Sequence, residues 1–437
     1  MKNTKFRNKR TTIIRKSLKF YNIMDIIIGG GISGLSYALF KNSEDYLIIE
    51  REPEIGGYCR TMKRNGFVWD YSGHFFHFQD DKIKNLLMAD LERDNRLVSV
   101  EKQTFIKYLE RYIDFPFQKN IHQLPQQEFI DCLVDLFRDR DEVYHNFKEM
   151  LYCKFGKSIA EKFLIPYNEK LYACDLNALD KDAMGRFFPY ASKEEIVKNF
   201  NTKNNASYNG SFVYPKDGAF EYIKEISKTL NPEKIKKNIS VESIDIENKK
   251  VILSDGNELV YDRLISTIPF PQLLDLCKIN YDKDGYSWNK VLVFNLGFDK
   301  KGPNKDSHWI YYPEKKYCFY RVGFYYNIIQ QDRTSLYVEL GFSKYDEINP
   351  NEWLGSVLSD LKLAGCITDD MRLVDYQSIV MDPAYVHITE SSQQDVADKK
   401  HFLSKYGVYS IGRYGSWTYC SIEDNIKEAQ NLANGLQ

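Results

Sequence analysis

The stretch Met24-Asp25-Ile26-Ile27-Ile28-Gly29-Gly30-Gly31-Ile32-Ser33-Gly34 decides the fold. An apolar run that leads into glycines, and then into the small and apolar residues 35–40, predicts a strand, a tight turn and a helix. Gly29 permits the turn, Gly31 lets the backbone approach a pyrophosphate, and Gly34 allows close packing of the helix on the strand. The helix N-terminus would then meet the phosphate charge. These residues predict a dinucleotide-binding unit.

A second apolar strand, Tyr46-Leu47-Ile48-Ile49, ends in Glu50, whose carboxylate would accept hydrogen bonds from the adenosine ribose hydroxyls. The pair Gly56-Gly57 and then Arg60 follow this acid, and this more restrictive pattern favours FAD over NAD. The expected FAD contacts in this part of the chain are Gly29, Gly31, Ser33, Gly34, Glu50, Arg51, Gly57 and Tyr58.

The composition gives no support for a nucleic-acid-binding, membrane-spanning or metal-binding protein. Among 437 residues, 60 lysines and arginines balance 61 acids, so the formal charge of -1 gives no argument for a nucleic-acid or membrane partner. No apolar run approaches the roughly 20 residues that span a bilayer. The eight cysteines show no metal-ligand spacing, which predicts reduced thiols, a cytoplasmic protein and no metal site.

Residues 1–23 carry only basic charges, which is compatible with a targeting or nucleic-acid-binding arm. This segment has no apolar core and no small-residue cleavage site. Met24-Asp25 would be a natural start for a Rossmann strand. We therefore expect a disordered leader or a misassigned start codon.

Helical spacing of apolar residues runs from about Asp81 to Pro189, and alternating strand patterns run from Lys290 to Val380. We therefore expect an α/β fold with an FAD-binding Rossmann-like domain, an inserted helical domain and an antiparallel β-sheet domain. The expected boundaries are 1–23 for the basic leader, 24–80 with 205–285 and 400–437 for the FAD-binding domain, 81–204 for the helical substrate domain, and 286–399 for the sheet over the flavin.

Including the opening glycine turn, a series of six motifs runs in order along the chain. They are GGGISGL (29–35), GHFFH (73–77), FPFQKNI (115–121), FLIPYNEKLY (163–172), WIYYPE with CFYR (309–314 and 318–321), and GRYGSWTY (412–419). Their order and spacing resemble the flavin-dependent UDP-galactopyranose mutase family, and the eukaryotic-type branch more than the shorter bacterial one. The resemblance runs from Met24 to the C-terminus.

This resemblance implies an isomerase that interconverts UDP-galactopyranose and UDP-galactofuranose for cell-surface polysaccharides. Reduced flavin N5 would attack the anomeric carbon and displace the diphosphate, with no net redox change. FAD would be active when reduced by an external donor such as NAD(P)H. A UDP-sugar would be the partner, and a homo-oligomer is possible.

The resemblance also assigns catalytic and flavin-side residues. Gly73 and His74 resemble a mobile histidine loop beside the isoalloxazine, although His74 could be an ordinary loop histidine. Arg186 and Arg321 resemble two arginines that hold the diphosphate, a task suited to bidentate donors that stay charged. Arg186 could instead be a surface arginine. The remaining flavin contacts that the resemblance implies are Arg413 and, at the start of the last helix, Ser421.

The resemblance also implies substrate contacts. Phe117, Gln118 and Asn168 fall where the family holds uracil, and Asn209 resembles a sugar contact. Phe115 and Tyr172 stand where relatives carry tyrosine and tryptophan, respectively. These two differences leave the identity of the sugar undetermined. Tyrosines at the diphosphate and flavin are expected at Tyr311, Tyr385 and Tyr419, unless these residues only pack into sheets.

Other functions remain open at this point. An FAD oxidoreductase of the amine oxidase or protoporphyrinogen oxidase type would share the fold and the glycine turn, but it would need no uracil pocket and no paired arginines. A mutase for a different nucleotide sugar and an inactive flavin-binding scaffold are further alternatives.

Removal of residues 1–23 is expected to leave the flavin content unchanged, because the predicted strand begins at Met24. The measurement is the ratio of flavin to protein absorbance in the purified truncated and full-length chains. Loss of flavin from the truncated chain would contradict the expectation.

Overall fold

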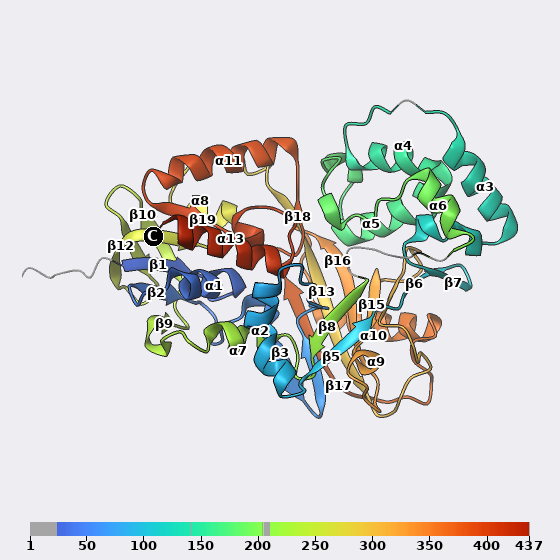
Figure 1. Ribbon diagram of the computed structural model, residues 1–437, viewed down its shortest axis with the longest axis horizontal. Coiled ribbons are helices and arrows are strands. Elements are labelled where there is room, and N and C mark those ends of the chain that lie inside the picture. The colour runs from blue at the N-terminus through green and yellow to red at the C-terminus, as the bar shows by residue number, and fades with distance from the viewer. Residues whose placement is uncertain (1–23, 141, 203, 205–209, 437) are drawn as a thin grey trace, which may run out of the picture.

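The computed structural model describes residues 24–140, 142–202, 204 and 210–436. Figure 1 shows a sheet flanked by helices around the N-terminal strand, a second sheet below it, and a separate group of helices at the upper right. The fold class expected from the sequence is therefore confirmed. The basic leader, 1–23, lies outside the described residues and stays a prediction.

The first sheet is built around β1 (Met24–Ile28), which pairs in parallel with β2 (Tyr46–Ile49) and β12 (Glu258–Ser266). Ile26 and Ile27 are fully buried because helices cover both faces of this sheet. The other parallel strands are β9 (Ile235–Lys236) and β19 (Val408–Ser410), and an antiparallel extension consists of β10 (Val241–Asp245) and β11 (Lys250–Leu253).

Two layers of helices enclose this sheet. On one face, α1 (Ile32–Lys41) and α13 (Ile422–Gly435) lie side by side in Figure 1 and share one apolar cluster with α2 (Asp81–Arg93) and α7 (Phe220–Ser227). On the other face lie α8 (Phe270–Leu276) and α11 (Glu390–Ser404). This two-sided burial places the ends of β1 and β2 at a covered edge.

The second sheet has the order β17-β13-β16-β15-β14-β6-β7, with β18 paired to β13. Its strands are β6 (Thr104–Tyr108), β7 (Arg111–Asp114), β13 (Ser287–Phe298), β14 (Trp309–Tyr311), β15 (Arg321–Phe324), β16 (Ser335–Ser343), β17 (Leu373–Met381) and β18 (Val386–His387). The outer face packs on α10 (Pro350–Leu363) and adjoins the short α9 (Tyr325–Ile328).

A hairpin of β3 (Thr61–Arg64) and β4 (Phe67–Asp70) joins the two sheets. The Trp69 ring stacks on Phe67 with centroids 5.2 Å apart, and its indole N–H donates to Ser335 Oγ at 2.8 Å. A second ribbon pairs β5 (Leu97–Glu101) with β8 (Ser211–Pro215).

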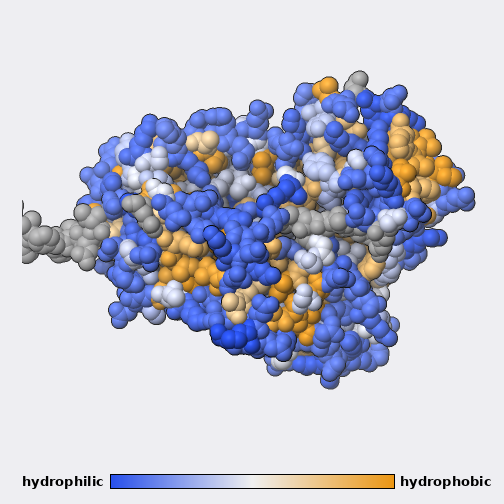
Figure 2. Space-filling model, in the orientation of Figure 1, coloured by the Kyte–Doolittle hydropathy of each residue, from blue (hydrophilic) through white to orange (hydrophobic). Residues whose placement is uncertain are grey.

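The separate helices are α3 (Gln126–Phe137), α4 (Phe147–Ile159), α5 (Ile165–Tyr172) and α6 (Lys193–Asn199), with a π-helical turn at Ala160–Leu164 between α4 and α5. Phe147, Leu151 and Phe155 are buried, as their spacing predicts. The outer face of α3 exposes Ile130, Val134 and Phe137, and apolar surface lies over this side of the molecule in Figure 2. A homo-oligomer stays a prediction.

The expectation that the segment 81–204 is helical is wrong for residues 97–114. It contains three strands, β5, β6 and β7, of which β6 and β7 extend the second sheet, and α2 packs on α7 of the first group. Thr104 and Ile106 face the core at a period of two, which is a strand signal that the later helical spacing obscured. The division into domains itself stays a prediction.

Gly34→Ala is expected to lower the free energy of unfolding by about 1–3 kcal/mol, because a Cβ there would overlap the backbone oxygen of Gly29. Gly355→Ala, in α10, is the control, since its Cβ would enter open space and alanine favours a helix. Thermal or denaturant unfolding compares the two variants. A Gly34→Ala protein as stable as the control would contradict the close packing of α1 on β1.

Candidate active site

The glycine turn after β1 forms one end of the site. Gly29, between β1 and α1, has a φ of +102°, which favours glycine. A buried carboxylate fixes the turn: the Gly30 N–H donates to Glu50 Oε2 at 2.7 Å, and the Glu52 N–H donates to Glu50 Oε1 at 2.9 Å. Because β1 and β2 are parallel neighbours, the turn and the acid lie at the same sheet edge.

This edge fits the pyrophosphate of a dinucleotide. None of the described side chains caps the N-terminus of α1 at Gly31, so the first N–H groups of the helix are available to an anion. The backbone at Gly57 faces Gly31, since a Cβ on Gly57 would lie 3.4 Å from Gly31 Cα. Side chains at either position would fill this space. The bare backbone on both sides therefore suits the expected FAD.

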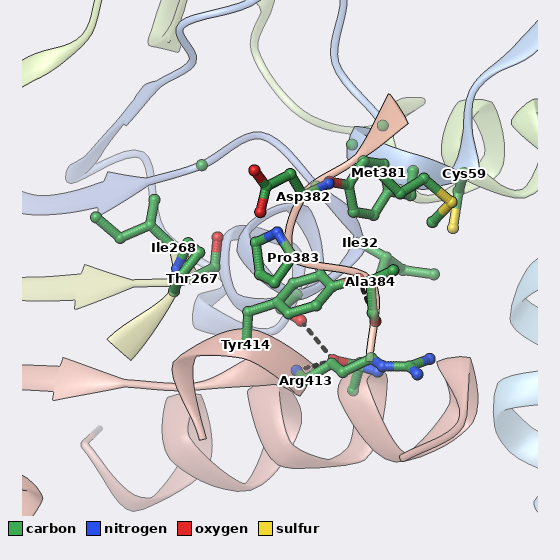
Figure 3. A pocket seen from close by; sticks show the side chains of 18 of the residues that line it. Ile32, Cys59, Thr267, Ile268, Met381, Asp382, Pro383, Ala384, Arg413 and Tyr414 are labelled. Carbon is green, nitrogen blue, oxygen red and sulfur yellow. Dashed lines mark hydrogen bonds between the residues drawn. The ribbon is translucent and has the colours of Figure 1, made fainter. Parts of the chain in front are cut away.

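The glycine turn lines one end of a cleft of about 460 Å³, within the ~300–1,000 Å³ of small-molecule sites. Figure 3 shows the segment 381–384 crossing the cleft between Ile268 and Cys59, with Tyr414 and Arg413 below it. The cleft continues to residues of the second sheet. The expected site residues on its wall are Gly29, Gly31, Ser33, Glu50, Arg51, Gly57, Tyr58, Gly73, His74, Arg321, Tyr385, Arg413 and Tyr419.

Arg413, on the single turn α12 (Gly412–Gly415), lies against two tyrosines. The Tyr385 and Tyr419 rings stack with centroids 5.7 Å apart, and the guanidinium carbon of Arg413 lies 5.0 and 4.7 Å from them. Arg413 Nε is buried without a hydrogen-bond partner among the described residues. A partly buried guanidinium group whose buried Nε is an open donor suits an anionic group of a ligand.

Arg321 begins β15 and pairs with Glu339, directly opposite on β16. Its Nε and Nη2 donate to the two carboxylate oxygens at 2.5 and 2.9 Å, and Glu339 is only 1% exposed. The other N–H groups of Arg321 have no hydrogen-bond partner in the described part of the chain, and the residue lines the cleft. The arginine therefore neutralises a buried acid and still presents donors to a ligand.

Glu339 also connects Arg321 to the histidine loop. The Ser72 hydroxyl donates to Glu339, and His74 Nδ1 lies 3.0 Å from the Ser72 carbonyl oxygen. A carbonyl only accepts, so Nδ1 carries the proton and Nε2 is left to accept. Burial lowers the pKa of His74 to about 4. The imidazole is therefore neutral at pH 7.

Arg186 does not line the cleft. It lies on the 3₁₀ turn Gly185–Phe187, and its guanidinium donates to both oxygens of Asp424, at 2.7 and 2.6 Å. Asp424 belongs to the first turn of α13, and the neighbouring Phe187 contacts Tyr419 edge-on at 4.8 Å. The expected second diphosphate arginine is thus close to the cleft but paired with an acid.

The residues expected at uracil lie in the aromatic core between the helices and the second sheet. Phe117 is fully buried and stacks on Phe163 at 5.2 Å. The Gln118 amide donates to the Pro189 carbonyl, and the Asn168 amide donates to the Leu164 carbonyl at 2.6 Å. The carbonyl oxygens of both amides are buried and have no hydrogen-bond partner among the described residues. Two open acceptors therefore remain beside an aromatic stack.

The other expected substrate contacts adjoin the cleft without lining it. Phe115 lies 5.1 Å from the Tyr311 ring, and the Tyr311 hydroxyl accepts from the Trp309 indole at 2.8 Å. Tyr172 is buried and contacts Tyr385 edge-on at 6.0 Å, which joins it to the stacked tyrosines.

Two expected flavin contacts, Ser421 and Gly34, do not line the cleft, and one expected substrate contact lies outside the described residues. Ser421 caps α13 by accepting from the Asp424 N–H, and it is not on the cleft wall. Gly34 permits helix packing and does not line the cleft. Asn209 lies outside the described residues.

Residues that the motifs did not single out also line the cleft, notably Glu339, Asp382 and Asn425. Glu339 had a signal in the sequence, because it is an acid within the apolar strand Leu336-Tyr337-Val338-Glu339-Leu340. A buried acid in such a strand requires a cationic partner. Asn425 accepts from the Arg413 N–H at 2.8 Å, a contact that depends on the fold.

Comparison with known proteins places these features in a family. The family described as "Flavin containing amine oxidoreductase" matches residues 32–408. Coproporphyrinogen III oxidase of Bacillus subtilis (strain 168) is 20% identical over 323 residues, which is 62% of this chain and 66% of that protein. The chain thus spans just under two thirds of this curated relative.

Solved structures give a stronger likeness. A crystal structure of reduced UDP-galactopyranose mutase has a TM-score of 0.87 and 25% identity, with 95% of this chain and 96% of that chain covered. A protein assigned as a protoporphyrinogen oxidase from Exiguobacterium sp. 255-15 has a TM-score of 0.72 at 17% identity, with 95% and 98% covered. Cyclohexylamine oxidase from Brevibacterium oxydans IH-35A has a TM-score of 0.65 at 14% identity, with 95% and 98% covered.

Within the described residues, no group of histidine, cysteine and acidic side chains could hold a metal ion, and no helix has the length and apolar character to cross a membrane. The eight cysteines are free thiols.

His74→Gln is expected to change how stability depends on pH. The folded pKa of about 4 lies below the usual value near 6.5, so neutral His74 contributes stability that is complete above pH 6.5 and is lost as the pH falls toward 4. The wild type should therefore lose up to about 3 kcal/mol relative to His74→Gln over this interval. Denaturant unfolding at several pH values measures the difference. The exposed His401→Gln is the control, and a flat difference curve for His74→Gln would refute the partly buried, neutral imidazole.

Proposed function

Because the chain belongs to the family of flavin-containing amine oxidoreductases and has FAD as its cofactor, we propose that it is a nucleotide-sugar mutase. It interconverts pyranose and furanose forms of a UDP-sugar, with UDP-galactose as the substrate to test first. Reduced UDP-galactopyranose mutase, to which the chain is similar over nearly its whole length, supports this assignment.

The observation that carries the proposal is the pair of arginines in the cleft beyond the glycine turn. Arg321 presents donors while Glu339 holds it, and Arg413 lies against the stacked rings of Tyr385 and Tyr419 with an open Nε. Two partly buried guanidinium groups are suited to a ligand that carries several negative charges, such as a nucleotide diphosphate. A cationic amine substrate would be repelled by these two charges.

In this proposal each part of the chain has a defined task. The glycine turn and Glu50 hold FAD, and Arg321 stabilises the departing diphosphate while tyrosines orient it. Neutral His74 offers Nε2 as a hydrogen-bond acceptor at the cleft wall. Bound FAD, when reduced, supplies a nucleophilic N5 for displacement of the diphosphate without net redox change.

The nucleobase end is proposed to lie at the aromatic core. Gln118 and Asn168 each keep a buried carbonyl oxygen open, and an open acceptor suits the N–H of a uracil ring. Phe117 and Tyr311 would supply aromatic faces. Arg186 is proposed to exchange Asp424 for the diphosphate when substrate binds. The sugar contact of Asn209 remains a proposal as well.

An FAD oxidoreductase is the second candidate, favoured by the family match and by the oxidases among the similar proteins. It differs from the mutase in one decisive respect, because it must reduce its flavin stoichiometrically with substrate. The mutase must turn over UDP-galactofuranose only in the reduced state.

Reduced and oxidised holoenzyme incubated with UDP-galactofuranose, with products separated by chromatography, tests the proposal. We expect UDP-galactopyranose only from the reduced enzyme. Arg321→Lys should lower kcat/KM about 100-fold, because lysine still neutralises Glu339 but cannot donate in a planar fork.

Arg64→Ala, which removes an exposed arginine paired with Asp375, is the control and should retain activity. Equal turnover in both redox states would contradict the mutase. Stoichiometric flavin reduction by an amine or a porphyrinogen would favour the oxidoreductase.

A further inference from the structure

Lys170 on α5 has an unusual set of partners. Its ammonium group donates to four backbone carbonyl oxygens, those of Tyr312 at 2.9 Å, Glu314 at 3.1 Å, Tyr317 at 2.9 Å and Phe319 at 2.5 Å. All four acceptors belong to one short segment, 312–319. An ammonium group has three N–H bonds, so the four oxygens surround it more as ligands surround a small cation than as a single hydrogen-bond acceptor would.

The segment 312–319 connects two strands at the cleft. β14 ends at Tyr311 and β15 begins at Arg321, and the Tyr312 N–H donates to the Tyr320 carbonyl at 2.8 Å. Tyr320 and Arg321 both line the cleft. The conformation of this segment therefore determines the position of Arg321 at the start of β15.

α5 itself is held firmly to the second sheet, so Lys170 has a fixed base. A Cβ at Gly341 on β16 would overlap the backbone oxygen of Lys170, which shows how closely the helix approaches the strand. The next two carbonyls of α5 accept from side chains of the sheet: Leu171 accepts from the Asn289 amide, and Tyr172 lies 2.9 Å from His387 Nε2. These contacts satisfy helix-end carbonyls that would otherwise lack partners.

Four carbonyl dipoles that point at one another repel, and buried carbonyls without donors are costly. A cation at their centre removes both penalties. Lysine suits this position because its charge is compact and its donors rotate, whereas the planar fork of arginine directs its donors along fixed lines.

We propose that Lys170 is a positioning residue whose ammonium group acts as a fixed internal cation for the segment 312–319, and so places Arg321 and Tyr320 for a diphosphate. The role in diphosphate binding rests on the proposed function. The organisation of the segment by an internal cation does not.

Two variants of the holoenzyme test the role of the charge. Lys170→Met keeps the length of the side chain without its charge, and Lys170→Ala opens space that n-propylammonium can fill. A surface cavity of about 480 Å³, lined in part by Pro166, Pro313 and Glu314, lies beside the segment. Lys148→Ala is the matched control, because Lys148 pairs with Glu169, the neighbour of Lys170, and makes no contact with the segment.

Calorimetric titration with UDP is the first measurement. We expect both Lys170 variants to bind UDP at least about tenfold more weakly than the wild type, since hydrogen bonds to a charged group are lost. n-Propylammonium should restore most of the affinity to Lys170→Ala, while n-propanol should not. Lys148→Ala should bind as the wild type does. Wild-type affinity in either Lys170 variant, or equal rescue by the neutral alcohol, overturns the proposal.

Hydrogen exchange of peptides within 312–320 is the second measurement, made without UDP. We expect faster exchange in Lys170→Ala that n-propylammonium reverses, and unchanged exchange overturns the internal cation. If the wild type itself does not bind UDP, the proposed function fails, and the exchange result alone decides the role of Lys170. Lys170→Arg keeps a charge and a long stem, so it covers the case in which the other two variants do not fold. Faster exchange in Lys170→Arg supports the role of the compact ammonium group, and wild-type exchange overturns it.

Discussion

The close approach of α1 to β1 is the constraint on which the site depends. Gly34 leaves no room for a side chain against the Gly29 carbonyl, so the helix begins where the strand ends. Its uncapped N-terminus then lies at the edge where Glu50 follows β2, and the Gly30 N–H reaches that carboxylate. A wider separation would move the helix N-terminus away from the acid and from Gly57. One small residue therefore aligns three separate contributions to the cofactor end of the cleft.

The substrate end depends on how buried charge is balanced. A guanidinium group removed from water is costly unless it is paired or covered by suitable dipoles. Arg321 meets this demand with Glu339, whereas Arg413 lies over the faces of Tyr385 and Tyr419, which attract a cation without cancelling its charge. The two arginines therefore differ in the charge that they present to a ligand. The positive charge of Arg413 remains available to a ligand, whereas the charge of Arg321 is balanced by Glu339 and its open N–H groups mainly orient the ligand.

Local patterns predicted the cofactor end well, because a strand, a turn and an acid placed next in sequence are also neighbours in space. Spacing and resemblance also predicted that Arg321, Tyr385 and Tyr419 share one site, and all three line the cleft. The sequence did not reveal the partner of Arg321, since Glu339 faces it only through the register of β15 on β16. The strands within 97–114 were missed although β6 and β7 form a local hairpin, because the helical spacing that follows obscured their alternation. The other partners of β5 and β6, which are β8 and β14, lie much later in the chain.

Arg186 and Arg321 illustrate why a motif cannot specify how an arginine is used. Arg186 pairs with Asp424 where both side chains are partly open to solvent, and such pairs contribute about 0–1 kcal/mol. Exchange of that acid for a diphosphate therefore costs little. Arg321 instead holds a carboxylate that is almost fully buried, and removing it would leave that charge unpaired at a cost of about 3–5 kcal/mol. It must keep Glu339 and bind a ligand with its remaining donors. The two arginines are thus suited to different parts of one anion: in the proposed function, Arg321 is a fixed contact that defines the site, and Arg186 is a contact made only when ligand is present.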